Sequence, residues 1–482
     1  MPHSRMSQWK DINQYDVKLF MAHVIAMGLV KRPNLENYWS QKSTVLTPFF
    51  GKYMSRNTFQ LLLSNLHIAD NQTNPHKDDP RHDKLHKVRP MLDMMKRNFM
   101  HRYKPLRELS FDEACCPWKG RLSFKVYNPS KTHKAHIKFF QVCEAASGYI
   151  YGFDIYTGET ACVQSARCSI DNASMTTKIV MGLLEEVRLL DNNHHVYMDN
   201  YYTSVELFEE LYNRNTLACG TFRQNRKLIP NCMKVKLKKK ERERGDTVFR
   251  RRGPLLSLRW YDKRDVYILS TIHEACYRKT GKVHYKTKQP IYKPEPIIEY
   301  THWMGGVDLG DQLMAYYSIL RRSVKWWRKL FIHLLNMIIH NAYVLNKKFG
   351  SSKLEHDEYR DAIVQYLLKM GRNRGNLPKP AQQSMKIQND YLTQQRLTGR
   401  HFACFIDCKL GAKRMKPSRA CHACNTNIRG FNLKTKYTSY WCQDCKKPLC
   451  VSPCFEFFHK YVDYKTRAIE HRMGAQVDED VQ

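Results

Sequence analysis

The chain has 482 residues, of which 42% are hydrophobic, so a mainly disordered chain is excluded and two to four domains are expected. Lys and Arg total 80 against 45 acidic residues, and this net charge of +35 points to a polyanion, either nucleic acid or an anionic membrane. A membrane is disfavoured, because the longest apolar stretch, residues 330–345, is short and interrupted by His and Asn, and no apolar signal segment opens the chain. We therefore expect a soluble intracellular protein whose size and charge suit the nucleus.

The first hundred residues are predicted to be mostly helical. Apolar residues recur at helical spacing in residues 17–30 and again in residues 59–66, where Ser55 and Asn57 are candidate N-caps. Residues 71–83 form a polar loop that contains proline. The sequence changes character near Pro105, where shorter periods begin.

A mixed set of strands and a helix is predicted after Pro105. Strand-like patterns occur at residues 109–113, 137–143, 149–156 and 195–198, and a helical pattern occurs at residues 176–190. Ser147-Gly148 fits a hairpin turn, and the last of these strands ends at Asp199. Three strands, a helix and a further strand are what an RNase H-like core gives, although many other mixed α/β folds share this order.

Two basic regions follow. Residues 216–298 alternate short strands with charged turns, and residues 233–252 carry ten basic and three acidic residues. That run is either a solvated, flexible turn or a loop that contacts phosphates. Helices resume after Met304, and residues 312–354 contain eight Lys or Arg and no acid. Within them, the segment 321–329 (RRSVKWWRK) is either a DNA-groove helix or an amphipathic helix whose Trp pair is core. Residues 371–379 are a basic linker, and residues 385–399 are a candidate last helix.

Four aspartates are candidate metal ligands. Two-metal phosphodiester chemistry needs several carboxylates that converge on one point, and Mg²⁺ suits such hard oxygen ligands. Asp112 lies in a strand-like segment, and Asp199 closes another. Asp308 and Asp311 are three residues apart and share one helix face. An aspartate after a strand is usually a turn or capping residue, so spacing alone does not decide between the two interpretations.

The C-terminal region carries a dense group of cysteines. Cys421-x-x-Cys424 and Cys442-x-x-Cys445 are followed by Cys450, Cys454 and His459. Paired thiolates at this spacing, in a reducing compartment, indicate two structural Zn²⁺ sites more often than disulfides or free thiols. Two tetrahedral zinc sites need eight ligands, so these seven leave one ligand unassigned. The candidates for it are His422, Cys404 and Cys408.

Several motifs, taken together and in order, resemble those of piggyBac-type transposases and their domesticated relatives. They are LSFDE (109–113), PWKGR (117–121), YNPSK (127–131), YTG (156–158), MDNYYTS (198–204), GTFR (220–223) and GGVDLGDQ (305–312). The likeness begins in the first forty residues and runs to about residue 465. Family members usually carry a long acidic N-terminal region, whereas this sequence starts almost at the segment expected to fold. Ala114, Cys115 and Cys116 stand where bulkier apolar residues are common.

The resemblance implies a mixed α/β fold. It comprises an RNase H-like DDE/D core with an inserted β-rich domain, a helical DNA-binding and dimerisation domain, and a cross-brace zinc module. The expected boundaries are 1–107 and 319–400 for the two parts of the helical domain, 108–215 and 299–318 for the core, 216–298 for the inserted domain, 401–465 for the zinc domain and 466–482 for a tail.

The resemblance also implies a reaction. Asp112, Asp199 and Asp308 are the expected catalytic triad, supported by Asp311, with two Mg²⁺ (or Mn²⁺) ions per site and two structural Zn²⁺ ions. The enzyme would nick transposon ends to free a 3′-OH, form and open a hairpin, and join the ends into TTAA target DNA. Expected DNA-contacting residues are Lys119, Arg121, Lys131, Arg223, Arg321, Arg322, Lys325 and Arg328.

The expected partners are double-stranded DNA (transposon ends and TTAA targets) and a second copy of the chain, in the nucleus and without a membrane. The alternative is a domesticated, catalytically silent protein that binds specific DNA sequences or chromatin. In the family a similar zinc module recognises the transposon end, and a protein-binding role for the module, as in chromatin readers, is the rival interpretation.

Overall fold

The computed structural model describes residues 9–158, 172–234, 243–372, 401–406, 417–425 and 435–472. The chain divides into two compact units, residues 1–373 and residues 374–482, which are described separately below. The helix expected at residues 385–399 lies outside the described residues. So do most of the expected linker, residues 235–242 of the first basic run, and Cys408.

The N-terminal segment is helical, as expected. Its helices are α1 (Gln14–Leu29), α2 (Pro48–Tyr53), α3 (Arg56–Asn65) and α4 (Arg89–Arg102), with short 3-10 turns between them. Asn13 and Asp16 form a capping box at the start of α1, so two backbone N–H groups without helical partners are satisfied. Ser55 caps α3 by accepting a hydrogen bond from the N–H of Thr58, whereas Asn57 lies inside that helix.

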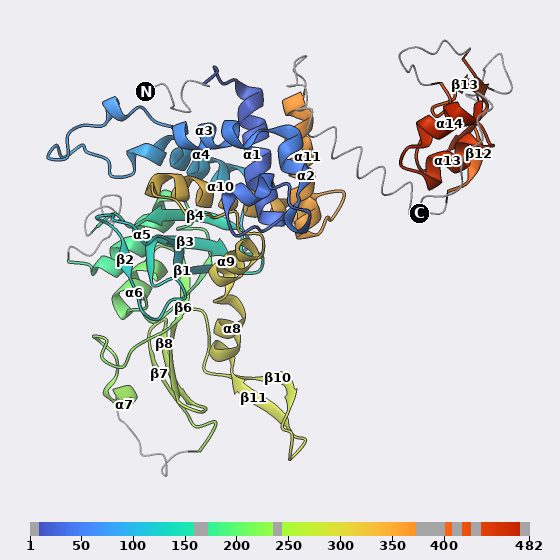
Figure 1. Ribbon diagram of the computed structural model, residues 1–482. Coiled ribbons are helices and arrows are strands. Elements are labelled where there is room, and N and C mark those ends of the chain that lie inside the picture. The colour runs from blue at the N-terminus through green and yellow to red at the C-terminus, as the bar shows by residue number, and fades with distance from the viewer. Residues whose placement is uncertain are drawn as a thin grey trace. The chain divides into compact units, whose positions relative to one another are not determined.

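Two later helices return to this segment (Figure 1). Helix α10 (Trp326–Phe349) contacts α4, and α11 (His356–Arg372) packs along α1. The fully buried Arg360 of α11 links this helix to α10 and to Tyr317. Its guanidinium donates to Asn336 Oδ1 at 2.8 Å and to the Tyr317 carbonyl at 3.1 Å. Segments more than two hundred residues apart in sequence thus share one helical core, as the resemblance implies.

A nine-stranded sheet forms the centre of the first unit. Its strands are β1 (Glu108–Pro117), β2 (Val126–Tyr127), β3 (Ala135–Glu144), β4 (Ile150–Ile155), β5 (His195–Met198), β6 (Leu217–Thr221), β7 (Thr247–Arg252), β8 (Leu255–Tyr261) and β9 (Asp265–Ser270). The order is β2-β3-β1-β5-β6-β9-β8-β7, and β4 also pairs with β3. Strands β1, β5 and β6 are parallel, and β3 is antiparallel to β1. The predicted order of three strands, a helix and a strand is therefore present, and the mixed α/β class is confirmed.

Helices cover both faces of this sheet. One face packs on α4 and α10 through residues such as Phe139 and Phe153, and these residues join a core cluster that also includes α1. The other packs on α5 (Met175–Glu186) and α6 (Val205–Asn213) through residues such as Phe111 and Val142. Strands β1, β3 and β4 are therefore largely buried on both faces, in keeping with their largely apolar sequences.

The strands expected as a separate inserted domain continue the central sheet. β6 pairs with β5 on one side and with β9 on the other, where Cys219 pairs with Ser270. The boundary expected at residue 216 therefore falls one residue before a strand that belongs with β5. Beyond β9, a hairpin of β10 (Tyr277–Val283) and β11 (Pro290–Pro294) leads into α8 (Glu295–Trp303) and α9 (Gly306–Tyr316).

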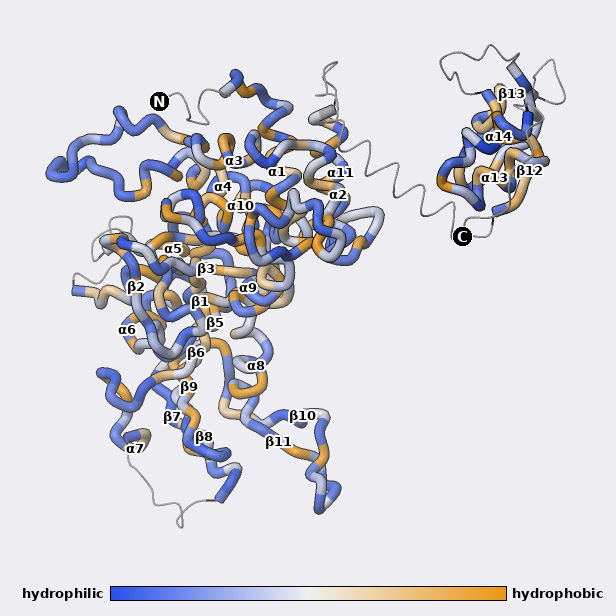
Figure 2. Tube along the Cα trace, in the orientation of Figure 1, coloured by the Kyte–Doolittle hydropathy of each residue, from blue (hydrophilic) through white to orange (hydrophobic). Residues whose placement is uncertain are grey.

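Helix α10 contains the longest apolar stretch of the sequence, and its interior polar residues have structural roles. Asn341 accepts a hydrogen bond from the N–H of Ile150 at 2.9 Å and donates one to the carbonyl of the same residue at 2.8 Å. Figure 2 shows this helix as a mixture of apolar and polar positions. In the described parts of the chain, no helix has the length and apolar character needed to cross a membrane.

The second unit is small and rich in cysteine. Its elements are β12 (Ala403–Phe405), β13 (Arg419–Ala420), β14 (Tyr437–Thr438), β15 (Tyr440–Cys442), β16 (Lys447–Pro448), α13 (Cys454–Lys460) and α14 (Tyr464–Arg472). Its core consists of five cysteines with Ala423, Leu449, Phe458 and Ala468, and the half-buried Cys445 and three aromatic side chains pack against it. A core of this size needs cross-links or metal ions for stability.

Candidate active site and metal centres

Two of the candidate aspartates lie side by side in the central sheet. Asp112 is in β1, and Asp199 directly follows the last residue of β5. These strands are parallel, and Phe111 of one pairs with Met198 of the other. Asp112 and Asp199 are the residues that directly follow this pair, one on each chain segment, and neighbouring strands are about 4.8 Å apart.

Helix α9 supplies the other two aspartates. Asp308 lies in its first turn, and Asp311 follows one turn later on the same face. The helix packs across β1 and β3, the strand that carries Asp112 and its antiparallel neighbour. Ser110 fixes the approach to α9, because its hydroxyl donates to the Met304 carbonyl at 2.6 Å.

Glycines let α9 approach the sheet with almost no side chain between them. A Cβ on Gly306 would lie 2.9 Å from Ala145 Cα, 3.0 Å from Ser110 Cβ and 3.1 Å from the Glu144 carbonyl oxygen. One turn later, a Cβ on Gly310 would lie 3.2 Å from the Gly148 carbonyl oxygen. Gly148 itself has a φ of 69°, in the predicted hairpin turn between β3 and β4. The GGVDLGDQ motif thus places its aspartates through the contacts of its glycines.

The aspartates interact electrostatically. Burial raises the pKa of Asp112, the hydrogen bond from the Glu113 N–H opposes this shift, and with smaller contributions from the charges of Asp199 and Asp308 the pKa is about 7. Burial and then Asp308 likewise raise the pKa of Asp311 to about 7. Burial also raises the pKa of Asp199, whose carboxylate accepts from the N–H of Tyr201 at 2.8 Å. Each of these carboxylates therefore resists ionisation, and a bound cation would favour the ionised form.

The donor set fits hard divalent cations. Four carboxylates from β1, β5 and α9 offer oxygen atoms on one side of the sheet, the ligand type that Mg²⁺ and Mn²⁺ prefer. Among the described residues, the groups of three or more ligands whose atoms all lie within 4.8 Å of one another are both in the Cys-rich unit. Three or more of the aspartate oxygens therefore do not lie within that distance of one another.

Cationic side chains border the aspartates. Lys131, a predicted DNA contact, interacts with Asp112 and Asp308, and these charges raise its pKa even though burial opposes the shift. Lys138 of β3 forms an ion pair with Glu113, the residue after Asp112. Sequence reasoning missed this pair. A lysine within the apolar run of residues 137–143 was the only signal for it.

The other predicted DNA contacts are dispersed. Lys119 and Arg121 are exposed after β1, and Arg223 is exposed after β6, where its Nε donates to Asn200 Oδ1 at 2.8 Å. Arg322 and Lys325 are also exposed, and Lys325 is the residue just before α10. Of the eight predicted contacts, Lys131 is the one whose charge couples to Asp112, Asp308 and Asp311.

The RRSVKWWRK segment combines both interpretations that the sequence left open. α10 begins at Trp326, and Trp327 is buried, so the Trp pair belongs to the core. Arg328 donates to the Ser64 carbonyl at 2.7 Å, and Arg321 donates to the Arg32 carbonyl and lies over the Tyr38 ring. Arg328 in α10 and Arg321 before it thus contact the N-terminal segment, and Arg322 and Lys325 are the exposed cations of the four predicted there.

The β10–β11 hairpin is a basic surface that sequence reasoning did not single out. Residues 277–294 contain six Lys or Arg and no acid, and Tyr277, Tyr285 and Tyr292 are exposed. Figure 1 shows the hairpin projecting beyond α8, and Figure 2 shows mostly hydrophilic positions along it. Exposed cations interleaved with aromatic rings suit a nucleic-acid strand or groove.

The cysteine-rich unit contains two groups of side chains that are close enough together to hold a metal ion. Cys421, Cys424, Cys450 and Cys454 form the first, and His401, Cys442, Cys445 and His459 form the second. Cys424 Sγ and Cys450 Sγ are 4.0 Å apart, near the spacing of about 3.8 Å between two thiolates at Zn–S distances of about 2.3 Å in a tetrahedron. The Cys442-Cys445 pair lies between the two pairs of the first group along the chain, which is a cross-brace.

Among the described residues, His401 completes the second group rather than the candidates His422 and Cys404, and Cys408 lies outside the described residues. His401 Nδ1 lies 3.4 Å from Cys442 Sγ and 3.6 Å from Cys445 Sγ. His422 points elsewhere, with Nε2 3.2 Å from the Tyr464 hydroxyl, and Cys404 lies in β12 outside both groups. His401 was missed because it stands far from any CxxC pair in sequence, and the pairing of β12 with β15 brings it close. His459 is oriented by its Nδ1, which lies 2.7 Å from the Phe455 carbonyl oxygen.

The chain is similar to transposases and to transposable element-derived proteins. The model of the family described as Transposase IS4 matches residues 2–343. Human piggyBac transposable element-derived protein 3 is 28% identical over 372 residues, which cover 76% of this chain and 60% of that protein. Human piggyBac transposable element-derived protein 2 is 27% identical over 340 residues, which cover 69% of this chain and 55% of that protein. The chain therefore spans a little over half the length of these relatives.

A solved structure shares the fold. The cryo-EM structure of a piggyBac transposase synaptic complex with hairpin DNA aligns with a TM-score of 0.68 and 20% identity, over 93% of this chain and 88% of that one. The mixed α/β architecture expected from the sequence is thus the architecture of that transposase.

The tight contact at α9 predicts that Gly306→Ala is destabilising. The added methyl group would meet backbone and Cβ atoms of β1 and β3, so overpacking should lower the free energy of unfolding by about 1–3 kcal/mol in a urea titration. Gly305→Ala is the matched control, because nothing lies within 4 Å of a Cβ there. Equal effects of the two substitutions would contradict the role given to Gly306.

The raised pKa values predict that Mg²⁺ binding weakens at low pH. Asp112 and Asp311, with pKa values of about 7, must lose their protons to bind a cation, so the apparent dissociation constant should rise about tenfold per pH unit below 7 for each proton displaced. Without Mg²⁺, the stability of the fold should show the opposite dependence on pH. Between about pH 4 and pH 7 the folded chain binds more protons than the unfolded chain, so the free energy of unfolding should fall as pH rises through that window. Calorimetry and thermal unfolding at several pH values check both trends, and pH-independent Mg²⁺ affinity would contradict them.

The second metal group predicts that His401→Ala reduces the zinc content of the full chain from two ions to one. The remaining ligands of that group would be two cysteines and His459, which leaves a coordination site open. His422→Ala is the control, since this neighbouring histidine belongs to neither group and should leave both ions bound. Elemental analysis of the purified proteins measures the difference, and loss of an ion in the control instead would reverse the assignment.

Proposed function

This chain belongs to the Transposase IS4 family and has the fold of a piggyBac transposase, and we propose that it is a metal-dependent DNA strand-cleaving and strand-transfer enzyme. The carrying observation is the convergence of Asp112, Asp199 and Asp308, from two adjacent parallel strands and the helix packed on them. Asp311 adds a fourth carboxylate one helical turn from Asp308.

Each side chain has a part in this proposal. Asp112 and Asp199 offer oxygens from adjacent strands, and Asp308 and Asp311 offer theirs from the facing helix. When bound, two Mg²⁺ or Mn²⁺ ions would activate the attacking oxygen and stabilise the leaving oxygen of a phosphodiester. The N–H groups of Glu113 and Tyr201 hold the Asp112 and Asp199 carboxylates in place. Lys131, beside these carboxylates, is positioned to contact a phosphate of the bound strand.

The proposed reaction follows the family. Cleavage at the element's end frees a 3′-OH, which attacks the opposite strand to form a hairpin, and the opened end is then joined into TTAA target DNA. We further propose that the enzyme works as a homodimer in the nucleus. Its zinc-binding unit, held by Cys421, Cys424, Cys450 and Cys454 and by His401, Cys442, Cys445 and His459, would bind the transposon end.

A DNA-binding protein that no longer cuts is the second candidate. It is favoured by the names of the human relatives, which are transposable element-derived proteins. Such a protein would keep the exposed cations and the zinc-binding unit, and its carboxylates would have no role in its function.

Cleavage of an end-labelled duplex that carries the element's terminal sequence beside TTAA separates the candidates. In Mg²⁺, Asp199→Asn and Asp308→Asn should lower cleavage by about 100-fold or more, since losing even an outer partner of a metal ligand costs about 10- to 100-fold. Asp357→Asn is the control for Asp308, because both are exposed aspartates in the first turn of a helix. A wild-type protein that binds the duplex but cuts no better than Asp199→Asn supports the second candidate.

A further inference from the structure

His340 of helix α10 is a fully buried histidine that has no part in the proposed chemistry. Its Nε2 lies 2.8 Å from the Gly148 carbonyl oxygen, and because a carbonyl oxygen only accepts, the ring proton is on Nε2. Its Nδ1 is buried and has no hydrogen-bond partner among the described residues. Burial lowers the pKa of His340 to about 4, so at neutral pH the ring is an uncharged donor to one carbonyl group.

The carbonyl group of Gly148 lies between His340 and the helix that carries two of the candidate metal ligands. A Cβ on Gly310 would lie 3.2 Å from the Gly148 carbonyl oxygen and 3.5 Å from His340 Nε2, so the three groups meet at one point. In the sequence of α9, Gly310 stands between Asp308 and Asp311. A shift of the turn at Gly148 would therefore displace the backbone from which both carboxylates project.

A second residue of α10 contacts the same helix. Asn336 Nδ2 donates to the Met314 carbonyl at 3.2 Å. Asn336 and His340 are four residues apart and lie on one face of α10, and Gly310 and Met314 are likewise one turn apart on α9. The two contacts thus occur in opposite order along the two helices, and together they fix the position of α9 along α10.

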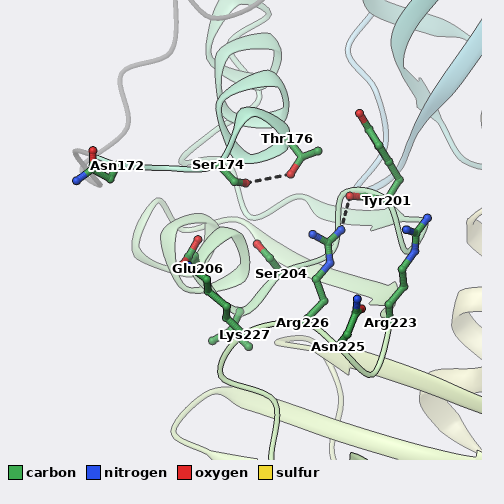
Figure 3. A pocket seen from close by; sticks show the side chains of 11 residues that line it. Asn172, Ser174, Thr176, Tyr201, Ser204, Glu206, Arg223, Asn225, Arg226 and Lys227 are labelled. Carbon is green, nitrogen blue, oxygen red and sulfur yellow. Dashed lines mark hydrogen bonds between the residues drawn. The ribbon is translucent and has the colours of Figure 1, made fainter.

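The other candidate ligands are held by different elements. Asp112 lies within strand β1, which is paired on both sides. The loop after Asp199 is held by Arg226, whose Nη2 donates to the carbonyls of Asn200 and Tyr201 at 3.0 and 2.5 Å. Figure 3 shows the contact of this guanidinium with Tyr201. Helix α9, in contrast, is placed by the close contact of its glycines with the hairpin turn, and α10 supports that contact.

We propose that His340 is a positioning residue for the metal-binding carboxylates. By donating to Gly148 it holds the turn against Gly310, and so keeps the carboxylates of α9 at the distance from those of the sheet at which they share bound cations. This role rests on the proposed function and extends it to a residue of the helical segment. Without the Nε2 donor, the Gly148 carbonyl would be a buried acceptor without a partner, and the turn would move to find another donor.

Two substitutions separate the hydrogen bond from the volume of the ring. His340→Gln has an amide N–H group that reaches the position of Nε2 and so keeps the donor, whereas His340→Leu has none. Should His340→Leu not fold by circular dichroism, His340→Met, which also lacks a donor and adapts to irregular spaces, takes its place with the same expectations.

Binding of Mn²⁺ to the full chain is measured from the electron paramagnetic resonance signal of the free ion, with zinc left in place and no chelator added. The pH is kept above the pKa of about 7 of Asp112 and Asp311. The Mn²⁺ that wild-type protein binds and Asp308→Asn does not is the ion at the carboxylates. His340→Leu should raise its dissociation constant about tenfold, the lower end of the range for groups that orient metal ligands from outside, and His340→Gln should restore it.

His333→Leu is the matched control. His333 is another buried histidine of α10, its ring packs edge-on against Phe139 of β3, and its Nε2 has no hydrogen-bond partner among the described residues. Its substitution should leave Mn²⁺ affinity unchanged. Equal weakening by His333→Leu and His340→Leu, equal weakening by the Gln and Leu variants of His340, or wild-type affinity in His340→Leu would each overturn the proposal. A wild-type chain that binds no more Mn²⁺ than Asp308→Asn contradicts the proposed function itself.

Discussion

The contact between helix α9 and the turn of the β3–β4 hairpin is the constraint on which the candidate site depends. Asp308 and Asp311 reach the sheet because Gly306 and Gly310 bring their own helix within van der Waals contact of Ala145, Gly148 and Ser110. A side chain at either glycine would separate the helix from β1 by the width of a methyl group or more. The distance between the two halves of a four-carboxylate site is therefore set by residues that have no ionisable group.

Electrostatic repulsion between the carboxylates opposes the close approach that the packing of α9 on the sheet imposes on them. The fold buries Asp112 and Asp311 near other carboxylates, and their pKa values rise to about 7 as a result. Lys131 and the Glu113–Lys138 ion pair offset part of the charge. Under the proposed function, bound cations would lie at the carboxylates, and basic side chains near them, such as Lys131, would contact the DNA strand.

The sequence predicted the individual strands and helices better than it predicted which of them lie next to one another. Apolar alternation was enough to find the strands that carry Asp112 and Asp199, because it records burial along each strand. It contains no information on register, so the adjacency of these residues followed only from family resemblance until the β1–β5 pairing was seen. His401 was missed for the same reason, since strand pairing brings it to cysteines about forty residues away. Arg321 and Arg328 were expected to contact DNA as a group with Arg322 and Lys325, but charge alone does not distinguish an arginine that binds a backbone carbonyl from one that is free.

The pairing of β6 with both β5 and β9 has a mechanical consequence. Strands β7, β8 and β9 are joined to the strand before Asp199 by ladders of backbone hydrogen bonds. Rotating these strands relative to the loop of residues 199–201 would require breaking hydrogen bonds between β6 and its neighbours, which costs free energy.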